Sequence, residues 1–312
     1  MEAFAIPFLL LVGAMLSVQA AANVQLSSAT GSPFGASTLQ LGIGAALLLA
    51  AAAVAGSLDA FRDLDHAEPW HLIGGLGSAV YITSGILLFP RLGAVLTVGL
   101  WIAGQMLASL VLDGCGWLGV EEEPLGPAKL AGGLAVLTGA ALIVRAQGAT
   151  PAGGLRGRGG RLLLGVLAGA ALPLQGAINA ELRSDLDATV AVGAVSVGGA
   201  TAGMALLLAA SLSLAGAPRP RLEPLRRMPW WGWLGGLAGA SYVTAVFLAI
   251  PAIGAAAAVG LTVAGQQVAS VFVDKFGWFR LQQRPVSRRR LAGVVLLLSG
   301  SALVALTQGG IS

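Results

Sequence analysis

Ten apolar stretches follow one another along this chain, and each is long enough to cross a lipid bilayer as a helix. A membrane-spanning helix needs about 20 apolar residues, and polar or proline-containing breaks separate the stretches. We therefore predict an all-α integral membrane protein with ten transmembrane helices. The predicted spans are 4–22, 37–56, 70–89, 93–112, 129–146, 161–180, 188–212, 230–250, 254–272 and 289–307.

The composition excludes the other broad classes of protein. Only 10% of the residues are charged and 56% are hydrophobic, whereas soluble proteins carry about 25% charged residues and disordered chains are poor in apolar ones. The single cysteine, Cys115, has no partner for an intramolecular disulfide, and no Cys/His cluster has metal-ligand spacing. At membrane depth we find no Ser–His pairing and no paired carboxylates. We therefore predict that the chain is not an enzyme and needs no cofactor.

The basic residues divide unevenly between the two sides of such a bundle. Of the 18, only Arg62, Lys129 and Arg183 lie on the side of the two termini, and 15 lie on the other side. Cytoplasmic loops carry an excess of lysine and arginine, so we expect both termini to be extracytoplasmic. The predicted partners are the lipid bilayer and a small-molecule substrate, without nucleic acid. A monomer and a homodimer both remain open.

The two halves of the chain, 1–150 and 151–312, resemble each other. Residues 81–117 agree with residues 242–278 at 17 of 37 positions when compared at a constant offset of 161, which indicates an internal repeat. The first spans of the two halves align at an offset of 156. Each half has five spans, an odd number, so the second half enters the membrane from the opposite side. We therefore predict two five-helix inverted repeats, an architecture common among secondary transporters.

Several repeated motifs are similar to those of the YdcZ-like family, a bacterial inner-membrane family of the drug/metabolite transporter superfamily. They are Gln-x-x-x-Asn in the first span of each half, Pro-x-x-Gly-Ala at a helical hairpin, Ala-Gly-Gln in the fourth span and Asp-x-x-Gly-Trp beyond it. The first half departs from the pattern at Ser17, where the second half has Pro173. The resemblance covers nearly the whole chain. It implies a fused pair of five-helix units in the inner membrane and small-molecule transport, with no settled substrate.

Spans four and nine carry a polar or aromatic residue at every fourth position, so these side chains share one helix face. Polar groups in hydrocarbon need partners, and we expect this face to point into the bundle or a watery cavity. The alternative is ordinary hydrogen bonding between helices. The predicted substrate-binding residues on these spans are Trp101, Gln105, Ser109, Thr262, Gln266 and Ser270.

Other polar candidates lie on the first and third spans of each half. A glutamine and an asparagine, four residues apart, sit toward the end of each first span, where an end-of-helix cluster is the alternative to lining a pathway. A tyrosine lies near the middle of each third span, and its hydroxyl needs a partner. These candidates are Gln19, Asn23, Gln175, Asn179, Tyr81 and Tyr242.

No Asp, Glu, Lys, Arg or His falls in the middle of a predicted span. Because an isolated charge in the membrane core costs several kcal/mol, we expect a solute that is neutral, zwitterionic, or a cation held by aromatic faces. The carboxylates available for ion coupling lie at span ends, where contact with water is the alternative role. They are Asp113, Asp274 and Glu181. His66 and His71 border the third span, where we expect solvated histidines.

These features favour a secondary transporter of a small organic solute, acting as an exporter or facilitator by alternating access between the two repeats. A pore or channel of the same architecture and a non-transporting membrane scaffold are the alternatives.

Overall fold

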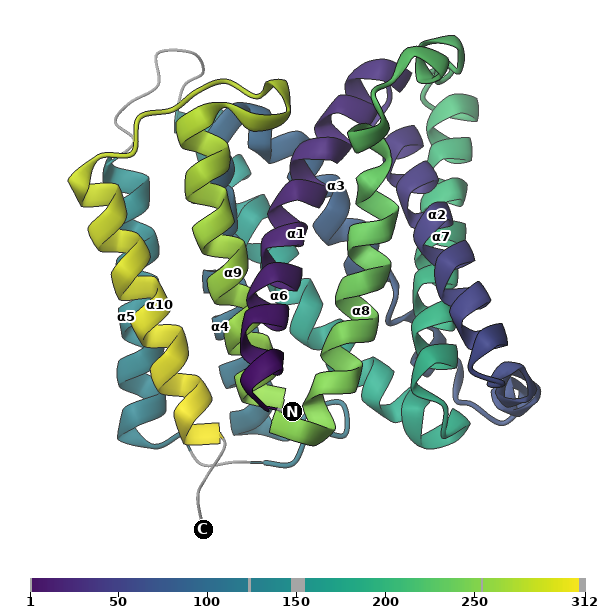
Figure 1. The fold of residues 1–312 in the computed structure, drawn as a ribbon, viewed down its shortest axis with the longest axis horizontal. Coiled ribbons are helices and arrows are strands. Elements are labelled where there is room, and N and C mark those ends of the chain that lie inside the picture. Colours follow the sequence, from purple (N-terminus) through teal and green to yellow (C-terminus); the bar gives the residue numbers. More distant parts are fainter. Residues whose placement is uncertain (1, 123–124, 147–154, 254, 309–312) are drawn as a thin grey trace.

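The computed structural model of the chain describes residues 2–122, 125–146, 155–253 and 255–308. Side chains are described throughout these ranges except at 2–5, 155–156, 246–258 and 307–308. The regular elements of this part are all helical (Figure 1). The α-helices are α1 (Glu2–Thr30), α2 (Pro33–Val54), α3 (Leu76–Leu92), α4 (Ala94–Cys115), α5 (Pro127–Ala146), α6 (Leu155–Leu186), α7 (Thr189–Ser213), α8 (Leu234–Ile253), α9 (Ala255–Phe276) and α10 (Arg288–Gln308). Short 3-10 helices are η1 (Leu58–Asp65), η2 (Pro69–Ile73), η3 (Glu223–Arg227), η4 (Trp230–Trp233) and η5 (Trp278–Arg280).

Eight helical segments within the described residues are long and apolar enough to cross a membrane. Two helices, α8 and α9, are not among the eight, and the side chains at 246–258, where these two helices meet, lie outside the described part. The apolar helices make the chain an integral membrane protein.

Two helices extend well beyond the predicted spans. The first predicted span ends at residue 22, whereas α1 continues to Thr30, and α6 exceeds its span at both ends. The hydroxyls of Ser28 and Thr30 donate to backbone carbonyls four residues earlier, at 2.9 and 3.0 Å. These polar residues therefore continue the helix instead of ending it, and α1 ends before Gly31, whose φ is +72°.

The Pro-x-x-Gly-Ala motif at 90–94 forms the expected helical hairpin between α3 and α4, but its proline does not end the helix. Pro90 lies inside α3, which continues to Leu92. The break falls at Gly93, whose φ of +84° is a backbone conformation that favours glycine. The glycine of the second Pro-x-x-Gly-Ala motif, at 251–255, is Gly254, which lies outside the described residues.

Helices from the first half of the chain pack against helices from the second half. The pairs α5–α10 and α2–α7 form the left and right edges of the bundle in Figure 1. Between these edges α1 packs against α8 and α9, while α6 packs against α3 and α4. Exchanging each helix for its counterpart in the other half therefore leaves this set of contacts unchanged.

Matched glycines allow the closest of these approaches. A Cβ atom added to Gly13 of α1 would lie 1.9 Å from the carbonyl oxygen of Thr262 in α9. The counterpart of Gly13 is Gly169 of α6, where a Cβ would lie 2.1 Å from the carbonyl oxygen of Trp101 in α4. Neither position has room for a side chain, because the helix backbones are in contact there.

The two faces of the bundle differ in charge. We call the lower face in Figure 1, where α1 begins and α10 ends, the terminal face; η1 and η2 lie there too. We call the opposite face the basic face. It carries the connection between α7 and α8, with four arginines at 219–227, and the four arginines at 284–290, where α10 begins.

Candidate functional site

A cavity of about 520 Å³ lies between α4, α6, α7, α8, α9 and α10. It extends from Gln175 and Tyr242 near the middle of the bundle to Arg183 and Thr189 at the terminal face. Most of its wall is apolar. Its polar lining residues are Gln105, Ser109, Gln175, Asn179, Arg183, Thr189, Ser196, Tyr242 and Ser301.

Five predicted binding residues line this cavity together, although they come from three helices. They are Gln105 and Ser109 of α4, Gln175 and Asn179 of α6, and Tyr242 of α8. The side chains of Gln105 and Ser109 have no hydrogen-bond partner among the described residues, so both are free to bond a solute. Gln175 accepts a hydrogen bond of 2.9 Å from the hydroxyl of Ser78 in α3.

A second, smaller cavity of about 70 Å³ adjoins the first. It is lined by Gln19 of α1, Gln40 of α2 and Tyr81 of α3, and it shares Gln175 and Tyr242 with the large cavity. The predicted residues Gln19 and Tyr81 therefore lie close to the large cavity without lining it. Gln175 and Tyr242 stand between the two spaces, near the centre of the bundle.

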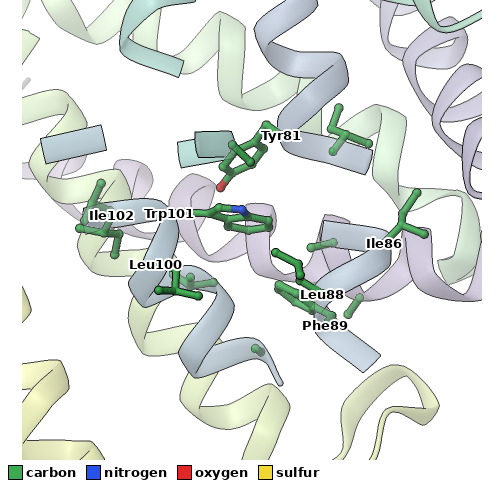
Figure 2. Close-up of a cluster of buried hydrophobic side chains, with 14 of the residues drawn as sticks. Tyr81, Ile86, Leu88, Phe89, Leu100, Trp101 and Ile102 are labelled. Atoms are coloured by element: carbon green, nitrogen blue, oxygen red, sulfur yellow. The ribbon is translucent and has the colours of Figure 1, made fainter. Parts of the chain in front are cut away.

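The remaining predicted residues lie in a closed core. The side-chain amide of Gln266 in α9 donates a hydrogen bond to the Tyr81 hydroxyl, and the Ser17 hydroxyl donates to the backbone carbonyl of Gln266 at 2.7 Å. The Tyr81 ring lies across the indole of Trp101, with centroids 4.1 Å apart (Figure 2). The indole N–H donates to the Ser84 hydroxyl at 2.9 Å. Trp101 is fully buried, so its aromatic face is used in packing and does not line either cavity.

Two further predicted residues, Thr262 and Ser270 of α9, are also buried. The Thr262 hydroxyl donates to the Val259 carbonyl at 2.9 Å, and the Ser270 hydroxyl donates to the Gln267 carbonyl at 2.6 Å. Their hydroxyls are thus bonded to the backbone of their own helix.

The two predicted asparagines occupy matched three-helix junctions. The Asn179 amide donates to the Ser196 hydroxyl of α7 at 3.0 Å, and the Asn23 amide donates to the Gln40 side chain of α2 at 3.3 Å. Because α1 and α6 are longer than predicted, both asparagines lie within their helices and not at helix ends. The interpretation as an end-of-helix cluster is therefore wrong.

Each asparagine oxygen faces a glycine of a third helical segment. A Cβ at Gly74 would lie 2.6 Å from the Asn179 oxygen, and a Cβ at Gly235 would lie 2.2 Å from the Asn23 oxygen. Gln40 also donates to the Gly235 carbonyl at 3.2 Å. The junction of Asn23 is thus closed by a longer side chain, whereas the shorter Ser196 leaves space for the large cavity.

The sequence reasoning missed Gln40, Ser196 and Ser301. The repeat offset of 156 aligns Gln40 with Ser196, and both are polar residues in the interior of apolar spans. That signal was sufficient to identify this pair. Ser301, whose buried hydroxyl has no partner among the described residues, has no polar counterpart in the first half, because residue 140 is alanine.

Asp113 and Asp274, two of the carboxylates predicted for ion coupling, occupy equivalent positions in the two repeats, and each forms an ion pair with a basic residue. Asp113 lies 3.3 Å from Lys129, and Asp274 lies 2.6 Å from Arg290, with each pair spaced by 16 residues. Asp274 is 3% exposed, so the alternative of a helix-end carboxylate in contact with water is wrong for it.

The Asp274 carboxylate also caps α4. It accepts hydrogen bonds from the backbone N–H groups of Ala94 and Val95, at 2.7 and 3.1 Å. These are the first N–H groups of the helix, which have no intrahelical acceptor. Asp274 therefore links α9, α10 and the start of α4 at the basic face.

The third predicted carboxylate, Glu181 of α6, lies at the terminal face. Its carboxylate packs against Gly119, where a Cβ would lie 1.6 Å from a carboxylate oxygen. Gly119 has a φ of +74° and belongs to the connection between α4 and α5.

His71 also lies near the terminal face, but it is not solvated. It is 6% exposed, and its Nδ1 lies 2.5 Å from a carboxylate oxygen of Asp185 in α6. The expectation of a solvated loop residue is therefore wrong for His71. The short helix η2 folds against α6 and α7, and this packing covers the imidazole.

Arg183 is the single charged residue in the described lining of the large cavity, and it stands at the mouth. The inner polar groups are amides and hydroxyls. Such groups both donate and accept hydrogen bonds, and they bind a polar uncharged group better than an isolated charge.

Comparison with known proteins places the chain in a family. The family model described as "Putative inner membrane exporter, YdcZ" matches it twice, over residues 4–142 and 161–303. A crystal structure of a protein has the same fold: it covers 96% of this chain and 96% of its own length, with a TM-score of 0.55 and 23% sequence identity. No curated protein matches the sequence. Because the two matched segments together span most of its length, the chain belongs to the YdcZ family of membrane proteins.

Proposed function

We propose that this protein is a secondary transporter that moves a small organic solute across the inner membrane by alternating access. The observation that carries the proposal is the different state of two matched glutamines. Gln105 lines the open cavity and has no hydrogen-bond partner within the described part of the chain, whereas Gln266 is buried and bonded to Tyr81. Equivalent positions are thus open on one side of the bundle and closed on the other, as expected for one conformation of a two-state carrier.

The proposed mechanism rests on two inverted five-helix repeats. The exchangeable helix contacts support this arrangement, as do the paired close approaches at Gly13 and Gly169. In such a protein, the second conformation is obtained when each half adopts the arrangement now held by the other.

We further propose that the termini lie outside the cell. The basic face then lies in the cytoplasm, in agreement with the excess of positive charge in cytoplasmic loops. The large cavity extends to the terminal face, so the described conformation is outward-facing. The family description supports export as the direction.

The solute we propose is uncharged or zwitterionic, with an apolar body and a group that hydrogen-bonds to amides. A volume of about 520 Å³ is typical of sites for small organic ligands. The inner wall supplies Gln105, Gln175 and Tyr242 without a described carboxylate. Of the aromatic residues expected to hold a cation, Trp101 is buried, and Tyr242 is the one that lines the large cavity.

The ion pairs of Asp113 and Asp274 are relevant to whether transport is coupled to a proton gradient. Asp113 and Asp274 each have a basic partner, and Asp274 holds three elements together. We propose a structural role for both carboxylates and transport that does not require a proton gradient, as in a facilitator.

A thermal-shift screen of the purified protein against metabolites and drugs tests the site. A ligand that binds the folded state raises its apparent stability, and the selected compound is then followed into proteoliposomes. We expect saturable flux that is reduced in Gln105→Ala. Flux that never saturates supports a pore, and the lack of both a ligand and flux supports a scaffold; either result contradicts the proposal.

A further inference from the structure

Gln267 of α9 is a buried amide with both polar atoms unsatisfied. The side chain is 0% exposed, and neither its nitrogen nor its oxygen has a hydrogen-bond partner among the described residues. Burial of an unpaired amide is unfavourable, because its hydrogen bonds to water are lost and not replaced. The described conformation is therefore destabilised by this unpaired amide, and a conformation in which the amide finds a hydrogen-bond partner is not.

Gln267 matches a cavity-lining residue of the other repeat and lies one helical turn from a second cavity-lining residue. At the repeat offset of 161 its counterpart is Met106, which lines the large cavity from α4. Val263, one turn earlier on α9, lines the same cavity. Since α9 runs from the terminal face to the basic face, Gln267 lies one turn deeper toward the basic face.

The counterparts of four other cavity-lining residues are buried on α1 and α9. Each is less than 3% exposed, and each is polar in a predominantly apolar bundle. They are Ser17, Asn23, Gln266 and Ser270, which match Pro173, Asn179, Gln105 and Ser109. The closed side of the bundle thus holds the side chains of a polar site, but no cavity has opened among them.

We propose that Gln267 is a binding residue of the opposite conformation, in which the cavity opens to the basic face. The proposal rests on the alternating-access function proposed above. When that cavity opens, the Gln267 amide gains water or solute as a partner, in the place that Met106 takes on the terminal side. The cavity on the basic face then has one more donor and acceptor, and it binds amide- or hydroxyl-bearing solutes more tightly than the cavity on the terminal face.

Cysteine labelling tests the assignment without a known solute. In a Cys115→Ala background, Gln267→Cys and Met106→Cys are treated with a membrane-impermeant methanethiosulfonate from either side, in right-side-out and inside-out vesicles. We expect Met106→Cys to react from the terminal face and Gln267→Cys to react from the basic face. If Gln267→Cys is inert from both sides while Met106→Cys reacts, the assignment of Gln267 is overturned and the cavity stands. If Met106→Cys is itself inert from the terminal face, the transport proposal fails, and the Gln267 assignment fails with it.

A second variant tests the energetic part of the inference. Gln267→Met keeps the side-chain volume and removes the unpaired amide, so it stabilises the described conformation against the opposite one. With Ser17→Cys as the reporter, we expect labelling from the basic face to slow about tenfold. The reciprocal variant, Met106→Gln, places an amide that is hydrated in the open cavity and is buried without a partner when that cavity closes, so it is expected to slow that labelling as well. An unchanged Ser17→Cys rate in Gln267→Met overturns the inference.

Discussion

Gln105 and Gln266 are the same residue at matched positions, yet they have different surroundings. Gln105 faces the cavity, and Gln266 bonds the Tyr81 hydroxyl in a closed core. The same substitution at these two positions therefore separates binding from stability.

We predict that Gln105→Ala weakens solute binding with little change in stability. Loss of one hydrogen bond is worth about 1 kcal/mol, or roughly a fivefold loss of apparent affinity. Gln266→Ala instead leaves the buried Tyr81 hydroxyl unpaired and lowers the free energy of unfolding by about 1–3 kcal/mol. Thermal unfolding in detergent and flux in proteoliposomes measure the two effects. Equal loss of stability in both variants would contradict the placement of Gln105.

A second prediction concerns Asp274. Asp274→Asn leaves the buried Arg290 without its counter-charge and weakens the cap of α4, so we expect a loss of about 3–5 kcal/mol in stability. The double variant Asp274→Asn with Arg290→Met removes the unpaired charge and is expected to recover part of that loss. Thermal unfolding of the single and double variants is the measurement. A stable Asp274→Asn protein that has lost only a dependence of flux on the proton gradient would show that this carboxylate couples transport.

The apolar stretches of the sequence predicted which helices form, and the repeat offset predicted which positions correspond. They did not predict helix length where Ser28 and Thr30 bond back to their own helix, because the same polar side chains also occur at helix ends. They also did not show which member of each pair faces a cavity. Trp101 stands where the second half has Thr262, and this difference in size acts through tertiary packing, which the sequence pattern does not record.

Backbone contact between helices leads to a third prediction. Gly13→Ala forces α1 away from α9, and Gly169→Ala forces α6 away from α4, because the added Cβ would overlap a carbonyl oxygen of the neighbouring helix. We expect both variants to be destabilised by about 1–3 kcal/mol, the usual cost of overpacking. Gly198→Ala in α7 is the control, because nothing lies within 4 Å of its added Cβ and alanine favours a helix. Equal unfolding temperatures in the three variants would contradict the close helix contacts.

For the whole molecule, the unequal distribution of arginines predicts the orientation. A reporter that is active only outside the cytoplasm, fused after Ser312, is expected to be active, and one that needs the cytoplasm is expected to be silent. The opposite result would reverse the assignment of the two faces. The cavity would then be inward-facing in the described conformation.

If the two faces of the bundle open in alternation, distances measured across each face change in opposite directions, and pairs of spin labels measure these distances. One label pair, at Ser184 and Leu306, spans the terminal face, and the matched pair at Ser28 and Arg145 spans the basic face; all four side chains are exposed. With increasing concentrations of a ligand from the thermal-shift screen, measured in lipid nanodiscs, we predict two distance populations for each pair. As one pair becomes longer, the other becomes shorter. A single unchanged distance for both pairs at every ligand concentration would contradict alternating access.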